Sequence, residues 1–472
     1  MKVPVSPPSQ EKLLELLKSG DVAKMALLFG QAVGPTDSKG RYLHWDKLRH
    51  LAMPKGYDAE LYWLAMRNAR EKISRDLSFK DKQGAPFRFC IPDTVMRDIL
   101  WISENATGAI KADSKISDPH TKQTYLINSL IEEAINSSQL EGASTTRQVA
   151  KDMLRSGRKP KDHSEKMILN NYNAMRFIRE YKEETLTKSM ICELHKIVTE
   201  DTLPTEDADK AGVFRGPDED IRVYSLDDKL LHTPPSYQEL DDRIQQLCDF
   251  VNAENENEAS FIPPVIKAIV VHFMIGYDHP FVDGNGRTAR ALFYWVMAKE
   301  GYWLMEYISI SRVLKQAPAQ YMAAYLHTET DGNDVTYFII HQLEVIKKSI
   351  ADLHRYLTDK AGEYREAEKI LKKSKLNGLL NHRQLGLLKN ALDNPGMEYT
   401  IKSHQNSHGI AYQTARTDLL ALSDKYHLLK KYKVGKKDVF IAPANMLNLI
   451  KNDWCIFSRA RAEQSRAEQS SA

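Results

Sequence analysis

Apolar residues recur every three to four positions along most of this chain, which is the spacing of one face of an α-helix. Near the N-terminus the pattern covers residues 10–30 and 42–70, and Pro54-Lys55-Gly56 breaks the second run. Later runs predict helices at 122–142, 167–181, 185–198, 237–252, 263–277, 287–300 and 335–356. Asp334 precedes the last run, where its carboxylate can cap the helix. The chain is therefore expected to be mainly α.

Residues 212–235 depart from this period. Val213-Phe214-Arg215 and Ile221-Arg222-Val223-Tyr224 are short β-prone runs on either side of Gly216-Pro217-Asp218. Two such runs around a turn predict a β-hairpin.

The C-terminal part has its own order of elements. Helices are predicted at 382–390, 401–408 and 411–425, followed by strands at 428–434 and 438–442 around Gly435-Lys436-Lys437. This order resembles a winged helix-turn-helix. The chain accordingly divides into a helical N-terminal module at 1–95, a central domain at 96–350, a charge-rich link near 363–374, a winged unit at 375–450 and a flexible tail at 459–472.

Composition narrows the class of protein. Of 472 residues, 42% are hydrophobic and 27% charged, as in soluble globular proteins. The four cysteines lack paired spacing, which favours a reducing compartment over a disulfide framework, and Cys192 with His195 alone does not make a zinc site. The sequence shows no signal peptide and no apolar run of about 20 residues, so a cytoplasmic protein without a membrane span is expected.

The strongest chemical signal is the stretch 279–290, His-Pro-Phe-Val-Asp-Gly-Asn-Gly-Arg-Thr-Ala-Arg, between two predicted helices. The start of a helix presents free backbone N–H groups and a positive dipole end, which attract anions. Gly284 and Gly286 flank Asn285 and let the backbone approach a phosphate closely. Arg287 and Arg290 lie three residues apart, on one face of the helix, where two guanidiniums can clasp a polyphosphate.

Two further residues of this stretch supply a metal ligand and a base. Asp283 offers a hard oxygen ligand for Mg²⁺, which commonly binds one or two carboxylates together with substrate phosphates. His279 is the one group of the stretch that can accept a proton near neutral pH. The stretch is therefore interpreted as an ATP-phosphate site.

Residues 279–290 match every specified position of the signature of Fic-domain proteins, His-Pro-Phe-x-Asp/Glu-Gly-Asn-Gly/Lys-Arg-x-x-Arg. The resemblance extends over roughly residues 120–345 and implies a helical core with a β-hairpin flap. It implies an adenylyltransferase that moves AMP from ATP onto a Ser, Thr or Tyr hydroxyl of a target protein. By resemblance, the site residues are His279 as catalytic base, Asp283 as Mg²⁺ ligand, the backbone of 284–286 and the Asn285 side chain on the α- and β-phosphates, and Arg287 and Arg290 on the outer phosphates.

One position of the motif bears on the transferred group. Family members that transfer a terminal phosphate carry Lys where this chain has Gly286, so Gly286 favours AMP transfer. Transfer of UMP or phosphocholine also occurs in the wider family and stays open at this point.

A second motif precedes the first. Ser137-Ser138-Gln139-Leu140-Glu141-Gly142 resembles the inhibitory signature of the family, Ser/Thr-x-x-x-Glu-Gly/Asn, placed N-terminal to the core. If Glu141 pairs with Arg290, that guanidinium cannot hold the γ-phosphate, and ATP binds in an unproductive pose. In some members the same glutamate positions a water that removes AMP, so Glu141 is expected to act as brake, hydrolytic base or both.

Partners are less defined than the reaction. A flap strand can pair with an extended target segment, and Tyr224 and Ser225 lie near enough in sequence to suggest self-modification. Ten Lys/Arg against five Asp/Glu over 382–446 give the winged unit a local charge of +5. The alternative function is therefore a nucleotide-sensing, DNA-binding transcriptional regulator. The family resemblance also suggests a homodimer.

Overall fold

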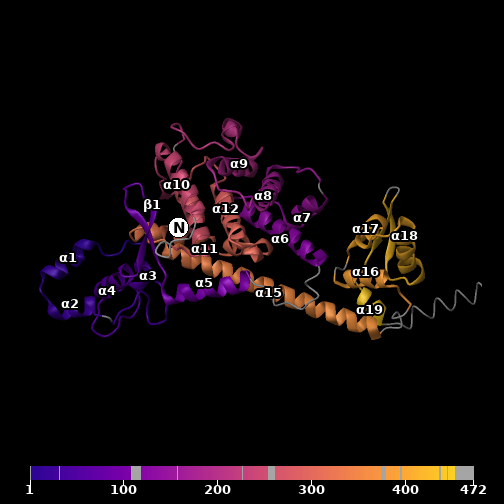
Figure 1. Ribbon diagram of the computed structural model, residues 1–472, viewed down its shortest axis with the longest axis horizontal. Helices are drawn as coiled ribbons and strands as arrows, with labels where there is room; N and C mark the ends of the chain where they lie inside the picture. The colour runs from indigo at the N-terminus through magenta and orange to yellow at the C-terminus, as the bar shows by residue number, and fades with distance from the viewer. Residues whose placement is uncertain are drawn as a thin grey trace, which may run out of the picture. The chain divides into compact units, whose positions relative to one another are not determined.

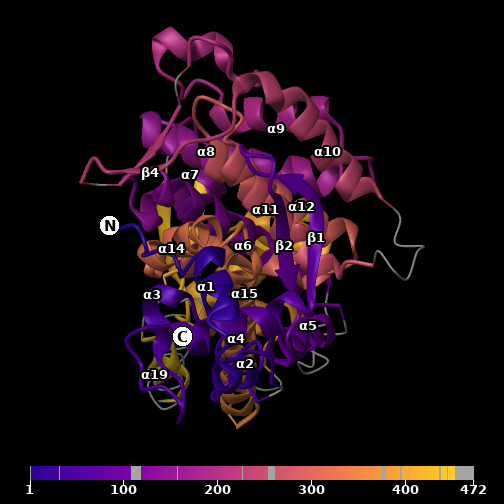
Figure 2. The same ribbon diagram turned by 90° about the vertical axis from the view of Figure 1, so that its left-hand side faces the viewer.

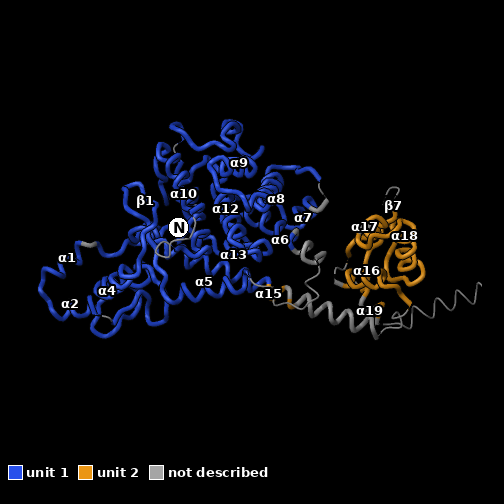
Figure 3. The backbone as a smooth tube through the Cα atoms, in the orientation of Figure 1, with its two compact units in different colours: residues 1–111, 119–353 blue, residues 112–118, 354–472 orange. Residues whose placement is uncertain are grey.

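A computed structural model describes residues 2–30, 32–107, 119–156, 158–219, 221–225, 227–253, 261–373, 379–393, 396–434, 437–443 and 445–451. The chain forms two compact units, one reaching to residue 353 and the other beginning at 354 (Figure 3). Helices dominate both units (Figure 1), which confirms the prediction of a mainly α protein. The predicted tail at 459–472 lies outside the described residues.

The first unit opens with short helices. Its elements to residue 199 are α1 (Gln10–Lys18), α2 (Val22–Phe29), α3 (Trp45–Leu48), α4 (Ala59–Glu71), β1 (Ser74–Lys80), β2 (Pro86–Cys90), α5 (Asp93–Ala106), α6 (Pro119–Leu140), α7 (Arg147–Ser156), α8 (His163–Glu180) and α9 (Lys188–Thr199). A small core under α2, α3 and α4 contains Leu28, Trp45, Trp63 and Met66. The predicted break at 54–56 falls between α3 and α4, as expected.

The hairpin β1–β2 is absent from the sequence prediction, which treated residues 1–95 as helical. The two strands run antiparallel and side by side (Figure 2), with Ser74 opposite Cys90. Alternate residues, among them Phe79, Phe87 and Phe89, are buried in the main core of the first unit. Period-2 alternation over only a few residues gives a weak sequence signal, which explains the miss.

The rest of the first unit consists of η2 (Thr205–Lys210), β3 (Val223–Tyr224), β4 (Leu230–His232), η3 (Tyr237–Glu239), α10 (Leu240–Asn252), α11 (Pro264–Asp278), α12 (Asn285–Lys299), η5 (Trp303–Tyr307), α13 (Ile310–Gln316), α14 (Pro318–Thr330) and α15 (Thr336–Lys373). Helices α11 and α12 pack against each other in the middle of the unit (Figure 1), and α12 also contacts α6, α8 and α9. Nearly every side chain of α11 is buried, which accounts for its apolar composition.

The predicted flap hairpin is shifted along the chain. Of the two β-prone runs, only Val223–Tyr224 forms a strand, and it pairs with Leu230–His232 rather than with residues 213–215. The backbone at 213–215 has other partners, because the N–H of Arg215 donates to Pro280 O at 2.9 Å. The local propensity was therefore overridden by a tertiary contact with the motif loop.

Helix α15 is longer than predicted. Asp334 Oδ1 accepts the N–H of Thr336 at 3.0 Å, which confirms the predicted capping residue. The helix then continues through residues 363–373, where a link was expected. A charge-rich composition is compatible with helix as well as with linker, so this boundary was not determined by the sequence.

The second unit contains the later part of α15 and then α16 (His382–Asp393), β5 (Glu398–Thr400), α17 (Ile401–His408), α18 (Tyr412–Leu420), the π-helical turn η6 (Ala421–Lys425), β6 (Lys430–Val434), β7 (Lys437–Ile441) and α19 (Met446–Lys451). Three helices and a final hairpin occur where predicted. The sequence missed β5, which pairs with β7 to give the strand order β5-β7-β6. The core of this unit includes Leu388, Leu419, Leu422 and Phe440.

No helix among the described residues is long and apolar enough to cross a membrane.

Candidate active site

The loop between α11 and α12 carries the predicted motif, and its conformation is set at both ends by left-handed residues. His279 ends α11 at φ 45°, and Gly284 precedes α12 at φ 77°. A side chain at Gly284 would be strained at that φ, and its Cβ would also lie 2.7 Å from Thr199 Cγ2. Glycine is therefore required at position 284 by conformation and by packing.

Asn285 braces the loop from within. Its Oδ1 accepts the N–H of Phe281 at 3.0 Å, and its Nδ2 donates to Phe281 O at 2.8 Å. Both polar atoms of the side chain are thus engaged, and the residue is 2% exposed. The expected contact of this side chain with the phosphates stays a prediction. Asn285 holds the loop in the shape that presents the first N–H groups of α12.

His279 is oriented as a proton acceptor. Its Nδ1 lies 3.2 Å from Gly276 O, and since a carbonyl oxygen only accepts, Nδ1 carries the proton in the neutral ring. Nε2 has no hydrogen-bond partner in the described part of the chain. Burial lowers the pKa of His279 to about 4, against the raising effects of the Gly276 hydrogen bond and the Glu141 charge. The imidazole is therefore neutral at pH 7, with its Nε2 lone pair free.

Arg215 fixes His279 from the flap side. Its Nε donates to His279 O at 2.9 Å, and its Nη2 donates to Pro235 O at 2.6 Å and to Asp278 O at 3.2 Å. The sequence prediction gave Arg215 only a place in a strand. An arginine within an apolar run can indicate a buried side chain that donates to backbone carbonyls. Nothing local in the sequence says which carbonyls it reaches.

Asp283 and Arg287 form a second pair at the loop. Arg287 is 1% exposed, and it donates to Val198 O at 3.0 Å and to Asp283 Oδ2 at 3.2 Å. The Asp283 side chain is 54% exposed. Arg287 thus contacts protein groups rather than open solvent, and it orients the Asp283 carboxylate at the surface of the site.

Arg290 is held by the end of α6. Its Nε donates to Ser137 Oγ at 2.9 Å, and its Nη2 donates to Ser137 O at 3.1 Å and to Glu141 Oε1 at 2.8 Å. Burial by itself lowers the pKa of Arg290, but the charge and hydrogen bond of Glu141, together with nearby Tyr321 and Glu133, outweigh it and the net shift is upward. Residues 153 positions apart in sequence are thus brought into one buried ion-pair cluster.

Gly286 lies against the Glu141–Arg290 ion pair. A Cβ at position 286 would meet Glu141 Oε1 and come within 3.0 Å of Arg290 Nη1. The Glu141 carboxylate therefore occupies space beside the start of α12, the place where a helix attracts an anion. Gly142, the last residue of the inhibitory motif, takes φ 95° where the chain turns away from α6.

His195 is a supporting residue that sequence reasoning considered only for a metal. Its ring stacks on Phe281 with centroids 3.7 Å apart and planes 1° apart. Nδ1 accepts the N–H of Gly212 at 2.9 Å, and Nε2 lies 2.8 Å from Asp283 O. Both nitrogens are engaged, and the described residues contain no group of three His, Cys, Asp or Glu side chains placed to bind a metal. The one sequence signal for this supporting role was a histidine within a predicted helix, with no second metal-ligand pair near it in the sequence.

The comparisons with known proteins find similarity to one family. The family model "Fic/DOC family" matches residues 185–297. Protein adenylyltransferase Fic of Nematostella vectensis is 26% identical over 213 residues, which are 44% of this chain and 46% of that protein. Protein adenylyltransferase fic-1 of Caenorhabditis elegans is 27% identical over 240 residues, 50% of this chain and 42% of that protein. The chain thus spans about half the length of the relatives it matches.

Among solved structures, a Fic family protein from Desulfovibrio desulfuricans covers 74% of this chain and 95% of its own, with 15% identity and a TM-score of 0.45. Fic-1 of C. elegans covers 56% of this chain and 71% of its own, with 20% identity and a TM-score of 0.42. The matched segment, residues 185–297, contains the motif loop and is the part of this chain that is similar to the Fic family.

Proposed function

We propose that this chain is a protein adenylyltransferase, which transfers AMP from ATP to a hydroxyl of a target protein. The observation that carries the proposal is the motif loop, where His279 presents a free Nε2 a few residues before the anion-attracting start of α12. The sequence relatives named as protein adenylyltransferases support it.

In the proposed reaction, His279 Nε2 takes the proton of the target hydroxyl. The hydroxyl oxygen forms a bond to the α-phosphorus, the bond from that phosphorus to the bridging oxygen breaks, and pyrophosphate leaves with the electron pair. The N–H groups at the start of α12 bind phosphate oxygens, and Arg290 binds the outer phosphates once Glu141 has released it. Catalysis of this type rests on positioning and on stabilising charge.

Asp283 fits the requirements of a Mg²⁺ ligand. Its carboxylate is more than half exposed, and Oδ2 contacts Arg287 at 3.2 Å, which leaves Oδ1 directed away from that contact. A single carboxylate suits Mg²⁺, which completes its coordination with water and substrate phosphates. When bound, the ion would neutralise charge on the phosphates. Asp283 would hold it, and Arg287 and His195 would position Asp283.

Glu141 is proposed as the brake. Its carboxylate satisfies Arg290 in the structure, so ATP must displace it to gain a productive γ-phosphate contact. The same carboxylate could position a water that removes AMP from a modified target. The two roles differ in what they change. A brake lowers the initial rate of AMP transfer, whereas a hydrolytic base lowers only the amount of label that stays on the protein after transfer.

The target is proposed to dock along the flap. Tyr224 and Leu230, on the two flap strands, are 52% and 44% exposed, and Val213 nearby is 48% exposed. An extended segment could add to the edge of this two-stranded sheet, which would bring a hydroxyl toward His279. Tyr224 and Ser225 are the proposed positions of self-modification.

The second unit has one observation that favours an anionic partner. Lys430, Lys431 and Lys433 are exposed along β6, and Gln413, Arg416 and Thr417 are exposed on α18. We propose that the unit is a winged helix, with DNA binding as the alternative function. DNA affinity should then fall steeply with salt, and affinity that does not change with salt would exclude this alternative.

The test of the main proposal uses ATP labelled at the α- or the γ-phosphate, with Mg²⁺. The variants are wild type, Glu141→Gly and Glu141→Gly with His279→Ala. Label from the α-phosphate alone, on protein, in Glu141→Gly but not in the double variant, is the expected result. Label from the γ-phosphate would mean phosphate transfer, and no label with either ATP in any variant would refute the proposal.

A further inference from the structure

A second cavity of about 590 Å³ lies within the first unit, away from the motif loop. Its walls come from residues 39–47, the first turn of α5, and one side each of α14 and α15. None of the residues at 137–142, 195–215 or 279–290 lines it. The volume is within the range of small-molecule sites, about 300–1,000 Å³.

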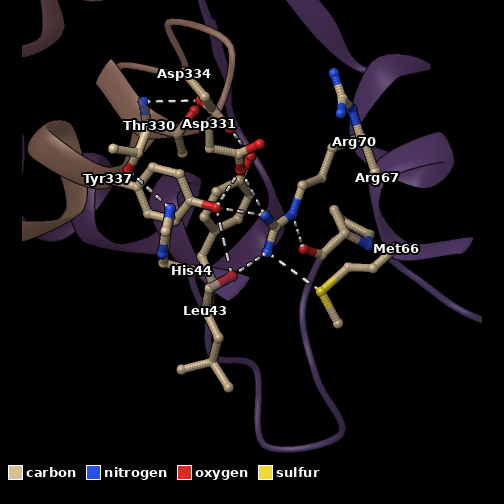
Figure 4. Close-up of polar contacts among 12 residues, drawn as sticks. Leu43, His44, Met66, Arg67, Arg70, Thr330, Asp331, Asp334 and Tyr337 are labelled. Carbon is tan, nitrogen blue, oxygen red and sulfur yellow. Dashed lines mark hydrogen bonds and ion pairs between the residues drawn. The ribbon is translucent and has the colours of Figure 1, made fainter. Parts of the chain in front are cut away.

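One wall of this cavity is held rigid by a buried polar network (Figure 4). Arg70 is 5% exposed and donates to Tyr337 Oη at 2.8 Å and to Leu43 O at 3.0 Å. Tyr337 Oη in turn donates to Asp331 at 2.7 Å. The segment at Leu43–His44 and the start of α15 are thereby fixed to each other, so this wall is preformed.

The cavity is lined by three imidazoles, of which one is structural. His44 Nδ1 accepts the N–H of Asp46 at 3.1 Å, and Nε2 lies 3.2 Å from Thr330 Oγ1 (Figure 4). His327 stacks on His44 with ring centroids 4.5 Å apart and planes 15° apart. His44 therefore supports His327 and has no nitrogen left for a ligand.

His327 and His341 differ from His44 in their hydrogen bonding. Neither nitrogen of His327 has a hydrogen-bond partner in the described part of the chain, and His341 has only a 3.5 Å contact of Nδ1 with Gln342. Burial lowers the pKa of His327 to about 3 and that of His341 to about 4. Both rings are neutral at pH 7, so His327 offers one N–H donor and one acceptor to a ligand, and His341 offers the nitrogen that does not contact Gln342.

The lining of the cavity carries more basic than acidic side chains. The lining includes Lys39, Arg41, Lys47 and Arg97, against the carboxylates of Asp98 and Glu344. Arg41 pairs with Asp37 at 2.7 Å, and Asp98 pairs with Lys347 at 2.6 Å and with Arg97 of the lining at 3.6 Å. Lys39 and Lys47 have no ion-pair partner within the described ranges. Two exposed ammonium groups thus stand beside flat, neutral hydrogen-bonding rings.

We infer that this cavity is a second ligand site and that it binds a free nucleoside monophosphate, with the base against His327 and the phosphate at Lys39 and Lys47. A stacked imidazole offers a flat face and an edge donor and acceptor, which suit a heteroaromatic base. Two unpaired ammonium groups suit a phosphate carrying about two negative charges. The site is independent of the proposed AMP transfer.

The experiment measures binding of AMP to the full chain by isothermal titration calorimetry, with adenosine and inorganic phosphate as separate probes. Lys47→Ala removes an ammonium group, and Lys55→Ala is the matched control, because Lys55 is also an exposed lysine of the N-terminal part but does not line the cavity. His327→Phe keeps a flat aromatic ring against His44 and removes both hydrogen-bonding nitrogens. Melting temperatures check that each variant is folded.

Lys47→Ala and His327→Phe are each expected to weaken AMP binding by about fivefold to tenfold, with Lys55→Ala unchanged. Adenosine and inorganic phosphate should each bind at least about tenfold more weakly than AMP. An AMP affinity that neither cavity variant changes would assign the binding to the motif loop and overturn the inference. Phosphate binding as tightly as AMP, or no AMP binding at millimolar concentration, would overturn it as well.

Discussion

The contact between Glu141 and Arg290 allows a quantitative prediction about activation. The Arg290 residue is 2% exposed and the Glu141 side chain 31% exposed, and their atoms lie 2.8 Å apart. A hydrogen bond between charged groups contributes about 1.5–3 kcal/mol. Because Glu141 is partly solvated, screening favours the lower half of that range. If ATP must break this bond, its removal should raise kcat/KM by about 10- to 50-fold.

Two substitutions separate charge from shape. Glu141→Gly removes both and is expected to give the full increase. Glu141→Gln keeps an oxygen that can accept from Arg290 but loses the charge, so we expect an increase of only a fewfold. Glu132→Gln is the matched control, since Glu132 also lies on α6 and pairs with basic side chains, Arg147 and Lys151, away from the motif loop.

The assay is the initial rate of α-phosphate label transfer to protein at subsaturating ATP, with the melting temperature of each variant recorded. A Glu141→Gly rate equal to wild type, in a folded protein that binds ATP, would refute the brake. Equal activation by Glu132→Gln would show that loosening of α6, rather than release of Arg290, is responsible. A rise in stable label without a faster initial rate would instead identify Glu141 as a hydrolytic residue.

Three further predictions follow from the site and its support. Because burial lowers the pKa of His279 to about 4, its neutral base form persists in weak acid. The kcat/KM of the Glu141→Gly chain should therefore fall only below pH ~5, and a fall centred near pH 6.5 would contradict this. Asn285→Ala leaves the N–H and the carbonyl of Phe281 without their side-chain partner, which should lower the free energy of unfolding by about 1–3 kcal/mol for each group. Urea unfolding measures this loss, and unchanged stability would show that these two hydrogen bonds are dispensable. Arg70→Met leaves the buried carboxylate of Asp331 without its cation and should lower the free energy of unfolding by about 3–5 kcal/mol, and a loss under about 1 kcal/mol would show that the network is not a stabilising anchor.

The motif loop could be located from the sequence because the residues that define it are neighbours along the chain. Within twelve residues, the glycines that allow a left-handed turn, the helix start and the charged side chains follow one another, and the structure places them in that order. The long amphipathic helices were predictable for a similar reason, since a sustained period of 3.6 is hard to mistake.

The partners of those residues were not predictable. The sequence did not predict that the Asn285 amide bonds to the backbone of Phe281, which it does because a buried side-chain amide must satisfy its donors and acceptors. The flap strand at 213–215 was lost to the contact of Arg215 with Pro280, which joins residues far apart in sequence. His195 had no visible role until folding placed it against Phe281.

The sequence by itself determined the motif, the helices around it and the family that the motif resembles, since each depends on neighbouring residues. The tertiary structure alone decided what each side chain meets: Glu141 on Arg290, Arg287 on Asp283, and His327 and His341 at a separate cavity. The physical reason is that hydrogen bonds and ion pairs depend on distance in space, which a linear pattern records only within a turn or two of helix.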